Sequence, residues 1–207
     1  MASYQHGGQV YQFARDQKQP ALKSLQSVLD FSASINPIQP FIDWQTLAHN
    51  AQISVGHYPD AEQVALKQAI AKRFQLKCEQ VTLTNGISSA IMSLFAEIKP
   101  DTSLLFTPIY GEYQRAAKLH SKQVIESAQA LSESGLINET TSQTIQSLSE
   151  NSLSVLVNPS TPEGIYHSPL VLKSLLNALK SSNCWVLIDE SFLPFISFDD
   201  SDSLRSQ

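Results

Sequence analysis

The sequence is poor in charge, and neither sign of charge forms a long run. Of its 207 residues 16% are charged, and nineteen acidic against fourteen basic residues give a formal charge of −5. No cluster of Lys or Arg is present that could follow a phosphate backbone or an anionic membrane surface. We therefore expect no nucleic acid and no membrane as a partner.

Cysteines and long apolar runs are also scarce. Cys78 and Cys184 stand far apart, each beside an apolar segment, which favours reduced and partly buried thiols over a disulfide framework. No apolar run of about 18 residues occurs, and the first residues lack a basic region followed by an apolar one. These absences predict a cytoplasmic protein.

Two common kinds of ligand site lack their signals. The five histidines show no H-x-x-x-H spacing and no pairing with cysteine, so no metal site is expected. Neither G-x-G-x-x-G nor G-x-x-x-x-G-K-[ST] occurs. Dinucleotide binding and P-loop nucleotide binding are therefore not indicated.

What is present is an alternation of strand and helix patterns from about residue 80 onward. Because 42% of the residues are hydrophobic, the chain can bury a substantial core. Short β-rich runs separated by helical patterns are typical of parallel βαβ units, so we predict an α/β fold. The expected strands are 81–84, 103–106, 123–126, 153–157 and 185–188.

Helical periodicity predicts the elements between these strands. Apolar residues repeat with helical spacing over residues 87–98 and over residues 172–179. A third helix could begin at a cap provided by Asp60. The second segment carries the start signal Ser168-Pro169. The apolar stripes are Ile87, Ile91, Leu94 and Ile98; Leu172, Leu175, Leu176 and Leu179; and Leu66, Ile70 and Phe74. Residues 1–59 have few periodic runs and are interpreted as an arm.

Polar turns follow the expected strands, where ligands of parallel sheets gather. In "TNGISS", residues 84–89, a glycine and two serines open a helix, which suits a phosphate but also an ordinary helix cap. The same residues approximate a G-x-S-x-G nucleophile elbow. That reading requires a histidine late in the chain, and none follows His167.

Two further side chains stand at strand ends. Tyr110, in "TPIYGEY", can stack on a planar ligand or lie at the rim of the core. Asp189 follows the apolar run 185–188, where a carboxylate is costly unless a cation or several donors pair with it. A protonated heterocycle nitrogen is one such cation, and a helix N-terminus is the alternative.

The motifs occur in an order that resembles a known family. They resemble the fold-type I, pyridoxal-phosphate-dependent aminotransferase superfamily, in the branch of threonine-phosphate decarboxylases and histidinol-phosphate aminotransferases. The resemblance implies a three-layer α/β/α large domain with a mostly parallel sheet over residues 60–207, here incomplete, and an N-terminal arm and small-domain segment over residues 1–59. The matching motifs are "HGG", "LDFSASINP", "YPD", "TNGISSAI", "TPIYGEY", "NPSTPEG" and "LIDESF".

The resemblance also implies a role for each site residue. Pyridoxal 5'-phosphate would be the cofactor, with its phosphate on the amides of Gly86 and Ile87 and the hydroxyl of Ser88. Tyr110 would stack on its ring, and Asp189 would pair with the ring nitrogen. The remaining residues implied are Thr161, which replaces the family's asparagine at the ring hydroxyl; Tyr58, reaching the cofactor of a partner subunit in a homodimer; and His6, Gly7, Ser34 and Asn36, near the substrate's phosphate.

One expected residue has no counterpart. The superfamily forms a Schiff base on a lysine beyond the aspartate, but the last lysine here is Lys180 and the chain ends at Gln207. The resemblance therefore implies an amino-terminal part of an enzyme that is inactive alone. Its uncovered sheet edge predicts low stability or association.

The resemblance implies an enzyme of amino-acid phosphate metabolism, most simply a threonine-phosphate decarboxylase of cobalamin biosynthesis. One alternative is an aminotransferase for histidinol phosphate or another amino acid. Another is a non-catalytic remnant that binds a phosphate ligand or a partner.

Overall fold

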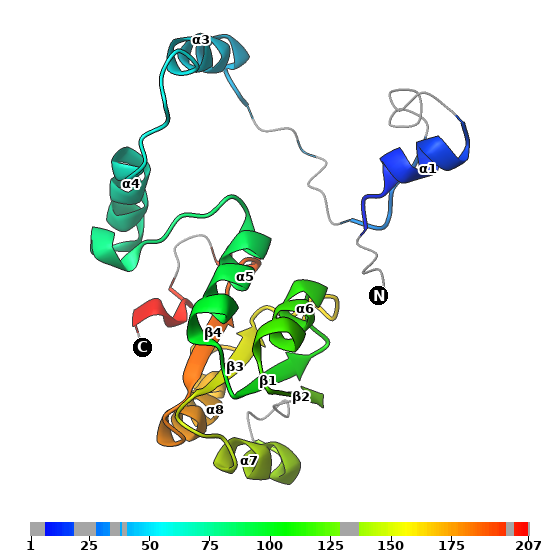
Figure 1. Cartoon of the computed structure of the whole chain (residues 1–207), viewed down its shortest axis with the longest axis vertical. Helices are drawn as coiled ribbons and strands as arrows, with labels where there is room; N and C mark the ends of the chain where they lie inside the picture. The colour runs from blue at the N-terminus through cyan, green and yellow to red at the C-terminus, as the bar shows by residue number, and fades with distance from the viewer. Residues whose placement is uncertain are drawn as a thin grey trace. The chain divides into compact units, whose positions relative to one another are not determined.

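The computed structural model describes residues 7–18, 28–33, 38, 41–128, 137–197 and 201–206. The chain divides into two compact units, Met1–Ala61 and Glu62–Gln207, and Figure 1 traces its elements in order.

The first unit contains two described helices, α1 (Val10–Asp16) and α3 (Trp44–Ser54). The carboxylate of Asp43 caps α3 by accepting hydrogen bonds from the amides of Gln45 and Thr46, each at 3.1 Å. None of the residues of α3 is buried. The sequence analysis missed this helix, although its cap and the helical spacing of Trp44, Leu47 and Ala51 were available signals.

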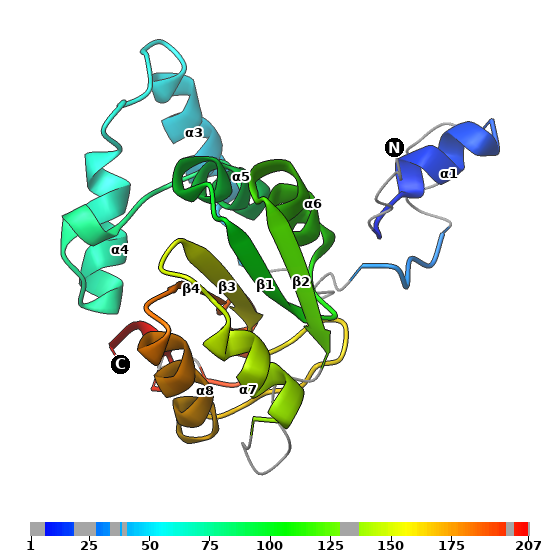
Figure 2. The same cartoon turned by 60° about the horizontal axis from the view of Figure 1, so that its bottom comes forward.

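The second unit is built on a parallel sheet of four strands in the order β2-β1-β3-β4 (Figure 2). The strands are β1 (Thr102–Thr107), β2 (Gln123–Ala128), β3 (Ser152–Val157) and β4 (Trp185–Asp189). Four of the five expected strands are thereby confirmed to within two residues at each end.

The expected strand 81–84 is wrong. Val81 has extended backbone angles, φ −111° and ψ 117°, but residues 81–84 belong to no strand. A strand needs a neighbour to receive its amides and carbonyls. Residues 81–84 pair with none of the four described strands, so their β-rich composition is not sufficient.

Helices of the second unit follow the predicted pattern with one correction. Ser168 caps α8 through a hydrogen bond from the amide of Val171 at 3.4 Å, as its start signal predicts. Asp60, however, does not cap α4, because Gln63 precedes that helix in the left-handed region at φ 55°. The elements are α4 (Val64–Phe74), α5 (Ile87–Ile98), α6 (Gly111–His120), α7 (Glu139–Gln146), α8 (Pro169–Ser181), and the short 3-10 helices η1 (Cys78–Gln80), η2 (Leu193–Phe195) and η3 (Leu204–Ser206).

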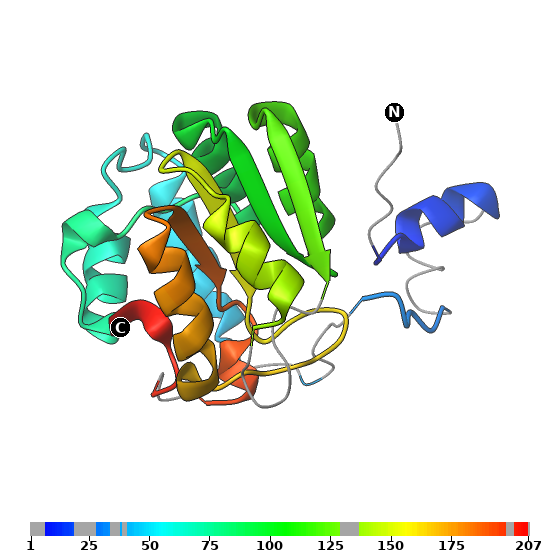
Figure 3. The same cartoon turned by 90° about the horizontal axis from the view of Figure 1, so that it is seen from below.

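Helices cover both faces of the sheet, which makes the unit a three-layer α/β/α structure (Figures 2 and 3). Along β1, Leu105 packs with residues of α5 and α6, whereas Leu104 and Phe106 pack with residues of α7 and α8. This alternation follows from the two-residue period of a strand. Both faces of the strand are buried, which explains its unbroken apolar run.

The strand order places a switch in the direction of the connections between β1 and β3. Because all pairings are parallel, the carboxyl ends of the strands lie at one edge of the sheet. After β1 the chain continues to β2 on one side, and after β3 it continues to β4 on the other side. The two connections therefore run in opposite directions along the sheet. Such a divergence is the usual place for a ligand in an open α/β sheet.

Candidate functional site

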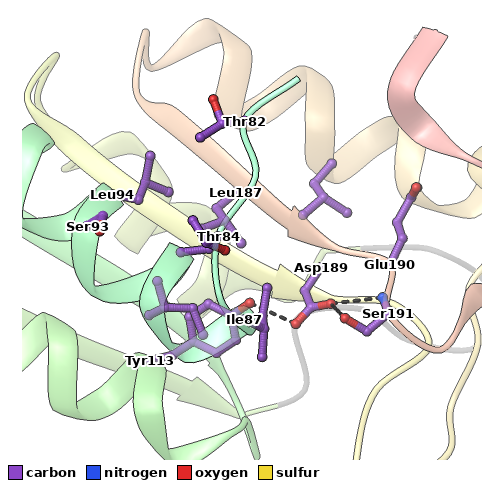
Figure 4. Close-up of a pocket in the computed structure, with 13 residues that line it drawn as sticks. Thr82, Thr84, Ile87, Ser93, Leu94, Tyr113, Leu187, Asp189, Glu190 and Ser191 are labelled. Atoms are coloured by element: carbon purple, nitrogen blue, oxygen red, sulfur yellow. Dashed lines mark hydrogen bonds between the residues drawn. The ribbon is translucent and has the colours of Figure 1, made fainter. Parts of the chain in front are cut away.

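A cavity of about 550 Å³ lies beside the carboxyl end of β4 and the first turns of α5 (Figure 4). Its walls are mostly apolar, and Asp189 is the carboxylate at the strand end. Among the residues that line it are Thr84, Ile87, Leu94, Tyr113, Leu187 and Asp189.

Asp189 is held by donors from two elements. Its Oδ2 accepts a hydrogen bond from the hydroxyl of Tyr113 at 2.7 Å. Its Oδ1 accepts from the amide of Ser191 at 2.9 Å and from the hydroxyl of Ser191 at 2.5 Å (Figure 4). The carboxylate is therefore oriented by several donors, and these hydrogen bonds lower the free-energy cost of placing a carboxylate at the end of an apolar strand. Each carboxylate oxygen retains capacity for a further donor.

Tyr113 is a residue of this site that the sequence reasoning missed. It lies on α6 three positions after Tyr110, and only 1% of its side chain is exposed. Burial, and then the charge of Asp189, raises the pKa of the Tyr113 phenol far above its usual value. The hydroxyl therefore stays protonated and acts as a donor. The available signal was the i, i+3 spacing of two tyrosines at a helix start.

Tyr110 and Ser88 come together from different elements. The hydroxyls of Ser88 on α5 and Tyr110 before α6 lie 3.2 Å apart. The Tyr110 ring is half-buried and meets Tyr113 edge-on, with ring centroids 6.4 Å apart and planes at 84°. Two residues that the sequence indicated separately thus share one surface.

The start of α5 offers donors for an anion. Gly86 precedes the helix at φ 85°, a backbone conformation that favours glycine, and its own amide donates to the carbonyl of Thr84 at 3.0 Å. The following amides, those of Ile87 to Ser89, have no acceptors within the helix because they belong to its first turn. These amides and the helix dipole suit a phosphate group.

The loop after β3 is closed by Asn158. Its side-chain amide donates to the carbonyl of His167 at 2.9 Å and its Oδ1 accepts from the amide of His167 at 2.9 Å. The amide of Asn158 also donates to the carbonyl of Asp189 at 2.9 Å. Thr161, half-buried in this loop, follows β3 at the edge of the sheet where Asp189 ends β4.

Two motifs of the first unit contact one another. The amide of Gly8 donates to the hydroxyl of Ser32 at 2.8 Å, which joins "HGG" to "LDFSASINP". A Cβ on Gly7 would overlap the carbonyl group of Ser32, so this approach requires glycine. The Tyr58 side chain is fully exposed. The other predicted residues of this unit, His6, Ser34 and Asn36, lie outside the described residues.

Cys78 and Cys184 are both free thiols and partly buried, as the sequence predicts. Within the described ranges, no group of three or more His, Cys, Asp or Glu side chains could hold a metal ion. None of the described helices has both the length and the apolar character needed to cross a membrane.

Comparison with known proteins gives consistent relatives. The chain is 28% identical over 174 residues to the threonine-phosphate decarboxylase of Salmonella typhimurium, covering 82% of this chain and 46% of that protein. It is 24% identical over 184 residues to a histidinol-phosphate aminotransferase of Acinetobacter baumannii, covering 83% and 46%. The chain therefore spans about half the length of these relatives.

Solved structures show the same fold. The histidinol-phosphate aminotransferase from Clostridium acetobutylicum superposes with a TM-score of 0.68 and 26% identity, covering 85% of this chain and 50% of that one. In sequence, residues 26–202 match the family described as aminotransferase class I and II. The chain belongs to the class I and II aminotransferase family.

Proposed function

We propose that the protein of which this chain forms at least a part uses pyridoxal 5'-phosphate and acts on a small phosphorylated amino acid, as threonine-phosphate decarboxylases do. The observation that carries the proposal is the Asp189 carboxylate, held by Tyr113 and Ser191 at the cavity. The similarity to a threonine-phosphate decarboxylase supports the substrate class.

The residues of the site fit this cofactor chemically. A phosphate suits the amides of Ile87 and Ser88 at the start of α5, and a planar heterocycle suits the half-buried ring of Tyr110. A protonated ring nitrogen suits the oriented carboxylate of Asp189. Ile87 and Asp189 line the cavity, whereas Ser88 contacts Tyr110, whose ring meets that of the cavity residue Tyr113.

When bound, pyridoxal phosphate would accept the electron pair released as carbon dioxide leaves the substrate. The chain's own contribution is binding and electrostatics. Asp189 would hold a proton on the ring nitrogen, because a carboxylate stabilises a neighbouring cation. The hydroxyls of Ser88 and Thr161 would donate to the phosphate and to the ring hydroxyl, and the apolar wall at Leu187 would exclude water.

The proposal extends to the first unit and to assembly. His6, Gly7, Ser34 and Asn36 would bind the substrate's phosphate, and the exposed Tyr58 would reach the cofactor of a partner subunit in a homodimer. A cytoplasmic location completes the proposal, and cell fractionation would test it.

Asp189→Asn tests the central residue. We expect the affinity for pyridoxal phosphate, measured by equilibrium dialysis, to fall about tenfold or more, because a charge-assisted hydrogen bond is lost. Glu190→Gln is the matched control, since Glu190 also lines the cavity but its carboxylate accepts hydrogen bonds from Ser203 and Leu204. Equal affinities of the Asn variant and the unaltered chain would contradict the role of Asp189.

An aminotransferase acting on histidinol phosphate is the second candidate, favoured by the structural likeness at a TM-score of 0.68. Product analysis with threonine O-phosphate separates the two. Release of carbon dioxide supports the decarboxylase, and amino transfer from histidinol phosphate to a keto acid supports the alternative.

A further inference from the structure

We propose that Tyr113 is a positioning residue, which orients the Asp189 carboxylate for a cationic ring nitrogen and leaves its negative charge available. The inference rests on the proposed function, because it assumes a ligand with such a nitrogen. It concerns a residue that the sequence motifs did not single out.

The contact joins distant parts of the chain. Tyr113 on α6 and Asp189 at the end of β4 are 76 positions apart, and their hydrogen bond is 2.7 Å long. The Tyr113 ring is 1% exposed and packs with core residues that include Ile91 and Leu105. A ring packed in this way has little freedom to move. Its hydroxyl is therefore a fixed point for the carboxylate.

The chemistry of the donors matters as much as their position. Asp189 accepts from a phenol, an amide and an aliphatic hydroxyl, all three of which are neutral. A lysine or arginine in the place of Tyr113 would neutralise the carboxylate and compete with a ligand's positive charge. Neutral donors instead orient the carboxylate without placing a positive charge beside it. Burial and the nearby carboxylate keep the Tyr113 phenol protonated by raising its pKa.

Ser191 constrains the other carboxylate oxygen. Its amide and hydroxyl both donate to Oδ1, whereas Tyr113 donates to Oδ2. Two oxygens held from different elements fix the plane of the carboxylate. Removing the Tyr113 hydroxyl would leave the group held at one oxygen only, free to turn about its side-chain torsion.

The decisive experiment compares two probes in Tyr113→Phe. The probes are pyridoxal phosphate and its carbocyclic analogue, in which C–H replaces the ring nitrogen. We expect about tenfold weaker binding of pyridoxal phosphate, since a hydrogen bond to a charged group is affected, and unchanged binding of the analogue. Tyr166→Phe is the matched control, because the Tyr166 phenol is hydrogen-bonded to Asp202 and neither residue lines the cavity.

A double-mutant cycle tests whether Tyr113 affects pyridoxal phosphate affinity through Asp189. If Tyr113 acts through Asp189, Tyr113→Phe added to Asp189→Asn causes no further loss of pyridoxal phosphate affinity. Equal weakening of both probes, or additive losses in the cycle, would show a merely structural role and would overturn the proposal.

A ligand-free measurement separates this proposal from the proposed function. In Asp189→Asn the pKa of the Tyr113 phenol should fall relative to the unaltered chain, because the neighbouring negative charge is removed. NMR titration of ring-labelled tyrosine detects this change, with Tyr113→Phe assigning the signal. An unchanged Tyr113 pKa would overturn the pairing itself, whereas a normal result with no pyridoxal phosphate binding would contradict the proposed function.

Discussion

Adjacent carboxylates at the end of β4 have different surroundings. Both line the cavity (Figure 4), but Asp189 accepts a hydrogen bond from Tyr113. Glu190 accepts from the hydroxyl of Ser203 at 2.6 Å and the amide of Leu204 at 2.7 Å. The two carboxylates therefore differ in their hydrogen-bond partners. Glu190 thus ties residues 203–204 to the end of β4.

Glu190→Ala tests this tether. We expect faster hydrogen exchange at the amide of Leu204, because its acceptor is lost, with little change in β4. Hydrogen-exchange mass spectrometry of the ligand-free chain would measure it. Asp189→Asn serves as the control and should leave the exchange of Leu204 unaltered.

Tyr113 also predicts a pH dependence of stability. Its pKa is raised in the folded state, so its contribution is complete below the unfolded value of about 10 and is lost as the pH rises above it. The free energy of unfolding should then fall by ~1.4 kcal/mol per pH unit. Urea unfolding between roughly pH 9 and pH 12, which is about one unit below to two units above the unfolded tyrosine pKa, would measure this decline.

The control for this pH dependence is Tyr113→Phe, which should remove most of the decline. Tyr166, which is half-buried and whose pKa is raised first by burial and then by Asp202, provides the comparison. A decline that persists in full in Tyr113→Phe would show that another group is responsible.

At the scale of elements, α8 is a helix whose buried stripe the sequence predicted. Leu172, Leu175 and Leu179 are fully buried and pack in one core cluster with Leu104 and Leu156 of the sheet. The i, i+3, i+7 spacing brings them to one face of the helix. Their burial therefore stabilises one of the two outer layers.

Leu175→Ala should lower the free energy of unfolding by about 2–5 kcal/mol, because it leaves a cavity in a packed core. Leu170→Ala, on the same helix at a side chain that is 80% exposed, is the matched control and should have little effect. Urea denaturation of both variants measures the difference. Similar losses at the two positions would contradict the packing of α8.

At the scale of the whole second unit, β4 has an open edge in the described sheet. The carbonyl of Asp189 accepts from the amide of Asn158 on the side of β3. Because backbone groups of a parallel strand alternate in direction, Leu187 also faces β3, while Val186 and Ile188 face away. An uncovered strand edge next to an apolar cavity predicts association.

Two proline variants test the open edge. Val186→Pro removes an amide that faces away from β3, so it should reduce self-association in sedimentation velocity while the fold persists. Leu187→Pro removes an amide that faces β3 and leaves its acceptor unpaired, so it should destabilise the unit by about 1–3 kcal/mol. Self-association that is unchanged in Val186→Pro would show that another surface is responsible.

Much of the second unit could be predicted from the sequence because its signals are local. The apolar runs of β1 and β3 and the leucine stripe of α8 are legible in a few consecutive residues, and the structure confirms them. The order of the strand-end motifs indicated the family, which the match over residues 26–202 confirms. The roles of individual site residues stay predictions.

Tertiary structure decided what depends on distant partners. The hydrogen bond between Tyr113 and Asp189 joins residues 76 positions apart, and no local pattern encodes it. Residues 81–84 have strand-like composition but pair with none of the described strands. Propensity and periodicity act over a few residues, whereas ladder pairing and the surroundings of a carboxylate are set only when separate elements pack together.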